Sequence, residues 1–314
     1  MTIAAENGNA WTPYEVSSAA AGTPDLASWL ATLGPDRLED LLIERKALVF
    51  RGFELSPDSL DPVLDLVVPG RLPYVHGNSP RTKVGGNLYT STEYPPQFTI
   101  SLHNEMAYAH RWPARLVFFC ETAAESGGAT PVLDGELWLS ALDGEIRDAF
   151  AGGLCYIQNL HDGLGFGKSW QETFETDDRA AVEEFLDASQ AQWKWGPDGL
   201  RISQYRPATV RHPVTGAEVW FNQADQFHPA GLGDRTAAEL YDILDPEEFP
   251  QYVTFADGSP IPDAFIEQIQ QRALELAVDV PWQRGDVLLI DNVLVAHGRR
   301  PFEGARRVLV AMSG

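Results

Sequence analysis

Cysteine, basic residues and long apolar runs are scarce in this chain, and each scarcity excludes a class of protein. Only Cys120 and Cys155 are present, too few for a disulfide scaffold or a cysteine-based zinc cluster and typical of a reducing compartment. No apolar segment is long enough to span a bilayer, and no basic stretch followed by an apolar run opens the chain. We therefore expect a soluble, cytoplasmic protein.

Positive charge is also in short supply. Lys and Arg number 23 against 45 Asp and Glu, which gives a formal net charge of -22. So much negative charge repels phosphate backbones and anionic lipid surfaces, so we expect neither a nucleic acid nor a membrane as partner. Four arginines near the end of the chain run against this sign and predict a local site for an anion: Arg299, Arg300, Arg306 and Arg307.

What is present indicates a folded protein with a substantial core. Hydrophobic residues make up 44% of the 314 residues and aromatic residues 11%, which excludes a disordered or fibrous chain. Internal repeats, linkers and low-complexity runs are not visible. The sequence therefore predicts one domain over residues 1–314.

Hydrophobic spacing and turn residues predict many short strands and a smaller number of helices. Apolar residues recur at helical spacing in four segments: Pro24–Leu33, Pro35–Arg45, Ser56–Val68 and Pro262–Ala277. Short apolar or alternating runs between turn residues predict strands, among them Ala47–Phe53, Phe98–Leu102, Ala114–Glu121, Ala129–Leu133, Cys155–Leu160, Leu200–Tyr205, Thr209–His212, Glu218–Asn222, Asp286–Asp291 and Arg307–Met312. Because strand and helix do not alternate regularly, we expect a mostly β fold, a barrel or jelly roll with flanking helices.

Two irregular segments are candidates for a lid over a functional site. Leu72–Ser101 is rich in Pro, Gly, Asn and Thr, and Gly163–Gly167 is rich in Gly. A long segment without regular structure inside a compact domain is usually functional. We therefore expect both segments to border the site.

A metal-binding pattern lies directly after the first of these segments. His103 and Glu105 stand two residues apart, and side chains at that spacing on a strand project to the same face. His297, just after the apolar run Val287–Ile290, is the candidate third ligand. Two imidazoles and one carboxylate on one face of an octahedron leave three positions open, as in non-haem iron(II) oxygenases.

Those three residues alone leave other functions open. Two His and a carboxylate also serve zinc with a bound water, so a zinc hydrolase is one alternative. A non-enzymatic protein that binds a metal or small molecule on the same scaffold is another.

Several motifs follow one another in a recognisable order over most of the chain. They are His103–Tyr108, Pro113–Cys120, Gly127–Pro131, Asp134, Arg206–Ala208, His212–Pro213, Thr215–Gly216, Trp220–Gln223, Asp291–Asn292, Ala296–Arg299 and Arg306–Met312. In this order they resemble a known family, the 2-oxoglutarate-dependent dioxygenases that include taurine dioxygenase and clavaminate synthase. The resemblance runs from about Ala47 to the last residue.

The resemblance implies a double-stranded β-helix core, iron(II) bound by His103, Glu105 and His297, and 2-oxoglutarate and O2 as cosubstrates. Thr130, 27 residues after His103, and Arg307, ten residues after His297, match the family's contacts to 2-oxoglutarate. Because adjacent strand residues point to opposite faces, Arg307 is expected to face the site and Arg306 to face away from it.

Two departures from taurine dioxygenase bear on the prime substrate. Taurine dioxygenases have Asp where this chain has Glu105, and a second Arg four residues after the first, where this chain has Ala311. A sulfonate is therefore not expected. A Glu at the position of Glu105 resembles the pattern of enzymes that hydroxylate amino acids in antibiotic biosynthesis.

We accordingly expect hydroxylation or desaturation of an amino acid or amino-acid derivative, with release of succinate and CO2. The substrate is either free or tethered to a carrier protein. Arg206 and Asn222 are the candidates for contacts to it.

Overall fold

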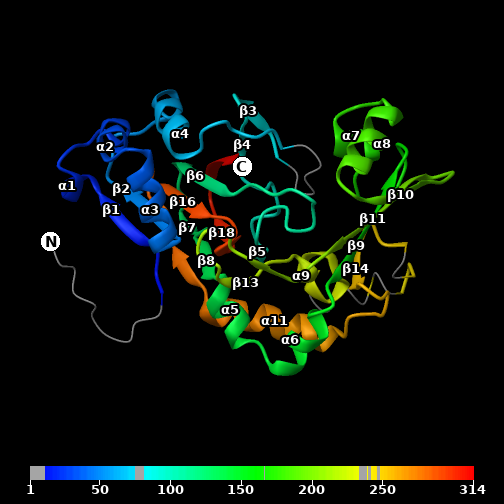
Figure 1. Ribbon diagram of the computed structural model, residues 1–314. Coiled ribbons are helices and arrows are strands. Elements are labelled where there is room, and N and C mark those ends of the chain that lie inside the picture. Colours follow the sequence, from blue (N-terminus) through cyan, green and yellow to red (C-terminus); the bar gives the residue numbers. More distant parts are fainter. Residues whose placement is uncertain (1–10, 75–80, 166, 233–238, 240–241, 246–247) are drawn as a thin grey trace.

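Two β-sheets face each other at the centre of the molecule, and helices cover their outer sides (Figure 1). The computed structural model describes residues 11–74, 81–165, 167–232, 239, 242–245 and 248–314. His76, and parts of the segments Leu72–Ser101 and Gly163–Gly167, lie outside the described residues.

The larger sheet has seven strands in the order β1-β2-β16-β6-β19-β4-β3. β1 and β2 are parallel, and the other neighbours are antiparallel. The strands are β1 (Tyr14–Ser17), β2 (Ala47–Arg51), β3 (Lys83–Gly85), β4 (Leu88–Thr90), β6 (Arg115–Thr122), β16 (Val287–Asp291) and β19 (Arg307–Ser313).

The second sheet has four strands in the order β15-β8-β17-β5, all antiparallel. They are β5 (Ile100–His103), β8 (Thr130–Asp134), β15 (Val278–Val280) and β17 (Val295–Arg299). Strands that are far apart in the sequence thus become neighbours here, because β17 inserts between β8 and β5.

A third sheet, β10-β11-β9-β14, and two short ribbons, β12-β13 and β18-β7, complete the strands of the described chain. Their bounds are β7 (Ser126–Gly127), β9 (Leu154–His161), β10 (Gln192–Trp195), β11 (Gly199–Arg206), β12 (Thr209–Arg211), β13 (Glu218–Trp220), β14 (Gln251–Phe255) and β18 (Phe302–Glu303).

The helices form three groups. Those of the N-terminal part pack on the outer face of the larger sheet: α1 (Ser18–Ala21), α2 (Leu26–Leu33), α3 (Pro35–Arg45), η1 (Pro57–Ser59) and α4 (Asp61–Val67). α5 (Gly135–Ala141), α6 (Gly144–Phe150) and α11 (Asp263–Leu276) pack behind the second sheet. α7 (Trp170–Phe174) and α8 (Arg179–Ala188) lie with β10 at the end away from α2 (Figure 1), and the short α9 (Ala224–Phe227) and η2 (Pro229–Leu232) complete the set.

β16 shows how the layers are specified by the sequence. Leu288 and Ile290 join the core between the two large sheets, whereas Val287 and Leu289 join the core under the N-terminal helices. A strand buried on both faces has no polar side to show, so its sequence is continuously apolar. The run that predicted this strand is therefore explained by helices on one face and a second sheet on the other.

Several predicted elements are confirmed and others are not. The helix Pro35–Arg45 has the predicted bounds, and the predicted helix Pro24–Leu33 begins two residues later. Ser56–Val68, predicted as one helix, is instead a 3-10 turn followed by α4. Leu72–Ser101 contains two short strands, β3 and β4, where no regular structure was predicted.

As a whole, the structure is sheet-rich, which is roughly consistent with the predicted mostly β fold, although helices and strands occur in comparable amounts. In the described part of the chain, no helix has both the length and the hydrophobicity needed to cross a membrane.

Candidate metal centre

His103 and His297 lie opposite each other on neighbouring strands of the second sheet. His103 is the last residue of β5, His297 is central in β17, and the two are direct partners in the antiparallel ladder. Directly opposed residues project from the same face of a sheet. Their imidazole rings have centroids 4.4 Å apart, so strand pairing alone brings two metal-ligating groups together.

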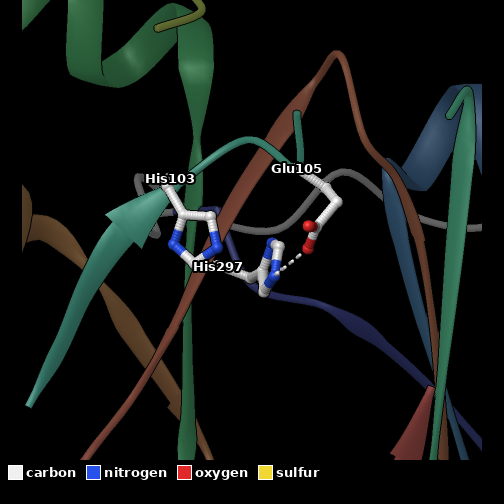
Figure 2. Close-up of side chains that lie close together, drawn as sticks. All are labelled: His103, Glu105 and His297. Carbon is white, nitrogen blue, oxygen red and sulfur yellow. Dashed lines mark ion pairs between the residues drawn. The ribbon is translucent and has the colours of Figure 1, made fainter. Parts of the chain in front are cut away.

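Glu105 reaches the same point from the turn that follows β5 (Figure 2). Its Oε2 lies 3.8 Å from Nε2 of His297. One ligand atom from each of His103, Glu105 and His297 lies within 4.8 Å of the other two. The structure therefore brings the predicted triad together, although Glu105 belongs to a turn and not to the strand on which the spacing argument relied.

Asn292 fixes the turn that carries Glu105. The Asn292 side chain accepts a hydrogen bond from the backbone N–H of Glu105 at 2.8 Å and donates to its carbonyl at 3.1 Å. The same side chain donates to the carbonyl of Pro113 at 2.8 Å, and Asn104 donates to the carbonyl of Asn292 at 2.7 Å. These groups are buried, and both ends of the Asn292 amide are engaged, so the turn that carries the carboxylate ligand is held by a buried polar cluster.

The protonation state of His297 suits a metal. Burial, and then the charges of His103 and Arg81, lower the pKa of His297 well below its ordinary value, so the ring is neutral near pH 7. Nδ1 of His103 lies 2.9 Å from the carbonyl of Ser101 and 2.9 Å from Nε2 of Gln226. A metal at Nε2 of His103 requires the tautomer with the proton on Nδ1, which the carbonyl accepts and the Gln226 amide opposes.

The donor set also fits the implied metal. Two imidazoles and one carboxyl group, all buried, are ligands that suit iron(II) and also zinc. Nδ1 of His297 is buried and has no hydrogen-bond partner among the described residues. The ring is thus held by β17 and its packing rather than by a polar partner within that part of the chain.

Two glutamines support the wall behind His103. Gln223 accepts from the backbone N–H of Ala107 at 2.9 Å and donates to the side-chain carbonyl of Gln226 at 2.7 Å. This fixes the amide orientation of Gln226, whose Nε2 then faces Nδ1 of His103 at 2.9 Å and the carbonyl of Ser101 at 3.4 Å. Gln223 thereby links the turn at Ala107 to the wall beside His103.

A cavity opens from the His103 and His297 side of this centre, and Thr130 lies in its wall. Thr130 is two residues from Val132, the ladder partner of His297, so it shares the face of the sheet with that ligand. Its hydroxyl accepts from Nε1 of Trp282 at 3.0 Å, which leaves the hydroxyl proton for another acceptor. The lining residues are Arg81, Ser91, Thr92, Ile100, His103, Phe118, Thr130, His297, Gly298, Arg299, Arg306 and Val308.

Arg306, just before β19, and Arg307, its first residue, point to the opposite sides from those predicted. Arg306 lines the cavity, whereas Arg307 is exposed and pairs with Glu121, Nε to Oε2 at 3.1 Å. The alternation of β19 gives the reason, since Val308 faces the cavity and Leu309 faces the helices. Arg306 is two residues from Val308 and shares its side, so the arginine of this pair that lies on the cavity side is Arg306.

Arg306 is a buried cation with donors still available. Its Nε donates to the carbonyl of Gly128 at 2.9 Å and its Nη1 to the hydroxyl of Ser91 at 3.4 Å, and neither bond uses Nη2. Burial, and then the nearby Arg299, lower the pKa of Arg306 to about 10. A cation destabilised in this way would be stabilised by an anion in the cavity.

The two predicted substrate residues do not line the cavity. The Arg206 guanidinium donates to the carbonyls of Tyr205 and Ser189 and to the side chain of Gln204. The Asn222 amide is buried and is engaged at both ends, by the carbonyl of Ala208 and by the N–H of Ala224. In the described structure both side chains are therefore bonded within the fold.

Two cavity residues were not assigned there from the sequence. Arg81 lies within the irregular segment Leu72–Ser101, where no motif or periodicity marks it. Arg299 was noted only as part of a basic cluster; its guanidinium donates to the carbonyls of Tyr94, Pro95 and Phe98 at 2.7, 2.7 and 2.8 Å. The position of Arg299 in β17, two residues after His297, could have placed it on the cavity side.

The comparison with known families decides what kind of protein carries this centre. Residues 12–313 match the family described as "Taurine catabolism dioxygenase TauD, TfdA family". The chain belongs to this family. It is thus an iron(II)- and 2-oxoglutarate-dependent dioxygenase that uses O2, as predicted.

Two relatives of this TauD/TfdA family member cover most of its length. The dapdiamide synthesis protein DdaC of Enterobacter agglomerans is 38% identical over 278 residues, which are 88% of this chain and 84% of DdaC. A clavaminate synthase-like protein of Arabidopsis thaliana is 33% identical over 286 residues, 88% of this chain and 83% of that protein.

Solved structures of low sequence identity share the fold. PvcB, an iron- and alpha-ketoglutarate-dependent oxygenase from an isonitrile synthetic pathway, superposes with a TM-score of 0.50 at 15% identity, covering 90% of this chain and 80% of PvcB. A taurine dioxygenase from Burkholderia xenovorans gives 0.50 at 17% identity, covering 90% and 81%.

Replacing either histidine should remove the metal but leave the fold. His103→Ala or His297→Ala deletes one of three ligands, so dialysed protein should retain no iron(II) by metal analysis, while its circular dichroism stays that of the parent. His110→Ala, at a half-buried position outside the centre, is the matched control and should retain the metal. Full metal content in either triad variant would contradict the assignment.

Gly298 should be required for the distance between the two histidines. A Cβ at this position would lie 2.5 Å from the carbonyl of Ile100 on β5, so Gly298→Ala must push β17 and β5 apart. We expect iron(II) affinity to fall about 10- to 100-fold, as for other changes next to metal ligands. Gly152→Ala, where a Cβ meets nothing within 4 Å, is the control; equal affinities in the two variants would refute the claim.

Proposed function

We propose that this dioxygenase hydroxylates or desaturates an unactivated C–H bond of an amino acid or amino-acid derivative in secondary metabolism. For hydroxylation, the substrate, 2-oxoglutarate and O2 give the hydroxylated product, succinate and CO2. The observation that carries the proposal is one cavity that has His103 and His297 in its wall and Thr130 and Arg306 in the same wall. Glu105 completes the triad at 3.8 Å from His297.

His103, Glu105 and His297 would hold iron(II), which supplies the oxidative chemistry when it is bound. Arg306 would bind the far carboxylate of 2-oxoglutarate, because a guanidinium offers paired N–H donors to a carboxylate. Thr130 would donate its hydroxyl proton to the same cosubstrate, held in that orientation by Trp282. A zinc hydrolase would have no need of this second, carboxylate-binding wall.

The relatives support the substrate class. DdaC is named for dapdiamide synthesis and is 38% identical, which favours a small molecule of secondary metabolism as substrate. With Arg306 in place of Arg307, the position four residues further is Val310, so the second arginine of taurine dioxygenases is again missing. A substrate without a sulfonate, as predicted from Glu105, is consistent with both observations.

The same comparisons support two further points. The two facing sheets are proposed to be the halves of a double-stranded β-helix, the jelly-roll core expected from the sequence. The family match over residues 12–313 supports a single catalytic domain for the chain. We propose no carrier protein as a partner on this basis alone.

Arg306 and Arg307 form a matched pair for a test of 2-oxoglutarate binding. In the absence of O2, iron(II)-loaded protein titrated with 2-oxoglutarate should develop the absorption band of an iron–keto acid complex. Loss of a hydrogen bond to a charged group costs about 1.5–3 kcal/mol, so Arg306→Gln should raise the dissociation constant about 10- to 150-fold. Arg307→Gln, on the exposed face, should leave it unchanged.

Admission of O2 then tests the reaction itself. Succinate should form from 2-oxoglutarate and increase when an accepted amino acid is present. A parent protein that gives neither the band nor succinate would refute the proposed function. Equal dissociation constants for Arg306→Gln and the parent would refute only the assignment of Arg306.

A further inference from the structure

Arg81 is a buried cation in the wall of the cavity, next to the metal centre. Its side chain is only 2% exposed, and Nη2 donates to Oε2 of Glu105 at 2.6 Å. The Tyr74 ring lies against the guanidinium, with its centroid 4.3 Å from Cζ. Neither the triad nor the proposed 2-oxoglutarate contacts require an arginine here.

Most of the hydrogen-bonding capacity of Arg81 is unused. Nε and Nη1, which carry three of its five N–H groups, are buried, and neither has a hydrogen-bond partner among the described residues. Burying a charged donor without a partner is costly, so such groups are usually completed by a partner or a ligand. Nη1 can donate a charge-assisted hydrogen bond to a carboxylate oxygen while Nη2 stays on Glu105.

The charges of the assembled site leave room for one more anion. Iron(II), Arg81 and Arg306 together contribute four positive charges; Glu105 and the two carboxylates of 2-oxoglutarate contribute three negative ones. Without a metal, the negative charge of Glu105 is available to neutralise Arg81. With iron(II) bound, Glu105 shares its charge between the metal and Arg81. With the metal bound, the site carries an excess positive charge beside Arg81, and buried excess charge attracts a counter-ion.

Lys168 strengthens this preference. It is half-buried, and burial, opposed by Glu172 and reinforced by the charge of Arg81, lowers its pKa. Arg81, Arg299 and Arg306 also line the same cavity, in a protein whose net charge is -22. A local accumulation of positive charge against the overall sign favours an anionic ligand at this wall.

We propose that Arg81 binds a carboxylate of the prime substrate. The inference rests on the proposed function and narrows its substrate class to molecules that bring a free carboxylate to the iron side of the cavity. An amino acid whose only carboxyl group is consumed as a thioester on a carrier protein cannot make this contact. The substrate is accordingly a free acid, or a derivative that retains one free carboxylate.

Anaerobic calorimetry on protein loaded with iron(II) and 2-oxoglutarate tests the proposal without turnover. The probes are the twenty proteinogenic L-amino acids and their C-terminal amides. At least one acid should bind the parent about 10- to 100-fold more tightly than its amide, the range expected for a charge-assisted contact. In Arg81→Gln that acid and its amide should bind alike.

Controls separate this role from simple support of Glu105. Arg81→Gln should bind iron(II) and 2-oxoglutarate within about threefold of the parent, whereas loss of a mere orienting partner would weaken the metal. Arg81→Lys, which keeps the charge, should restore part of the preference for the acid. Arg300→Gln, where the arginine pairs with Asp279 on the surface, should behave as the parent.

Any of three outcomes would overturn the proposal. In the first, no probe binds; in the second, acids and amides bind the parent with equal affinity. In the third, Arg81→Gln lowers the affinity for iron(II) as much as the affinity for the acid. The iron–keto acid band of the parent is measured in the same samples. Failure of that band refutes the proposed function, whereas a normal band with equal acid and amide binding refutes Arg81 alone.

Discussion

The pairing of β17 with β5 is the constraint on which the rest of the centre depends. It sets His297 opposite His103, and it also fixes β8 on the other side of β17, which brings Thr130 to the same face. Gly298 permits the close approach of the two strands. Any movement between β17 and β5 would therefore change the metal geometry and the cosubstrate wall together, so both depend on one ladder of backbone hydrogen bonds.

The sign of the charge that lines the cavity is opposite to that of the net charge of the chain. The protein is strongly acidic, yet Arg81, Arg299 and Arg306 all line one cavity. Their partners differ: Arg299 donates to three backbone carbonyls, Arg306 to two neutral oxygens, and Arg81 to one carboxylate. In the described chain both Nη groups of Arg299 are engaged and its Nε has no partner, whereas Arg306 and Arg81 each have an Nη group that makes none of these bonds. Net charge thus says little about the ligands of a buried site.

Elements and residues that are marked by local signals could be predicted from the sequence. Those that depend on the register between strands could not. Pro35 and the buried run of β2 mark their elements directly, and His103 and Glu105 follow from spacing. To choose between Arg306 and Arg307, one must know which face of β19 is turned toward the cavity. The sequence does not show this, because the register of β19 against its neighbour shifts at Arg307. Arg81 lies in an irregular segment, so only the folded chain places it at the metal. Chemistry at contacts between distant segments is hidden from local patterns.

The position of Glu105 in a turn has a consequence for how such sites diversify. The backbone of this residue is held by Asn292 and not by a strand ladder. The carboxylate ligand can therefore be lengthened or shortened, as between Glu and Asp in related enzymes, without a change in sheet register. The two histidines lack this freedom, because each is a rung of the sheet. In this scaffold the acidic ligand is the adjustable part of the metal centre, and evolution can retune it while the architecture stays constant.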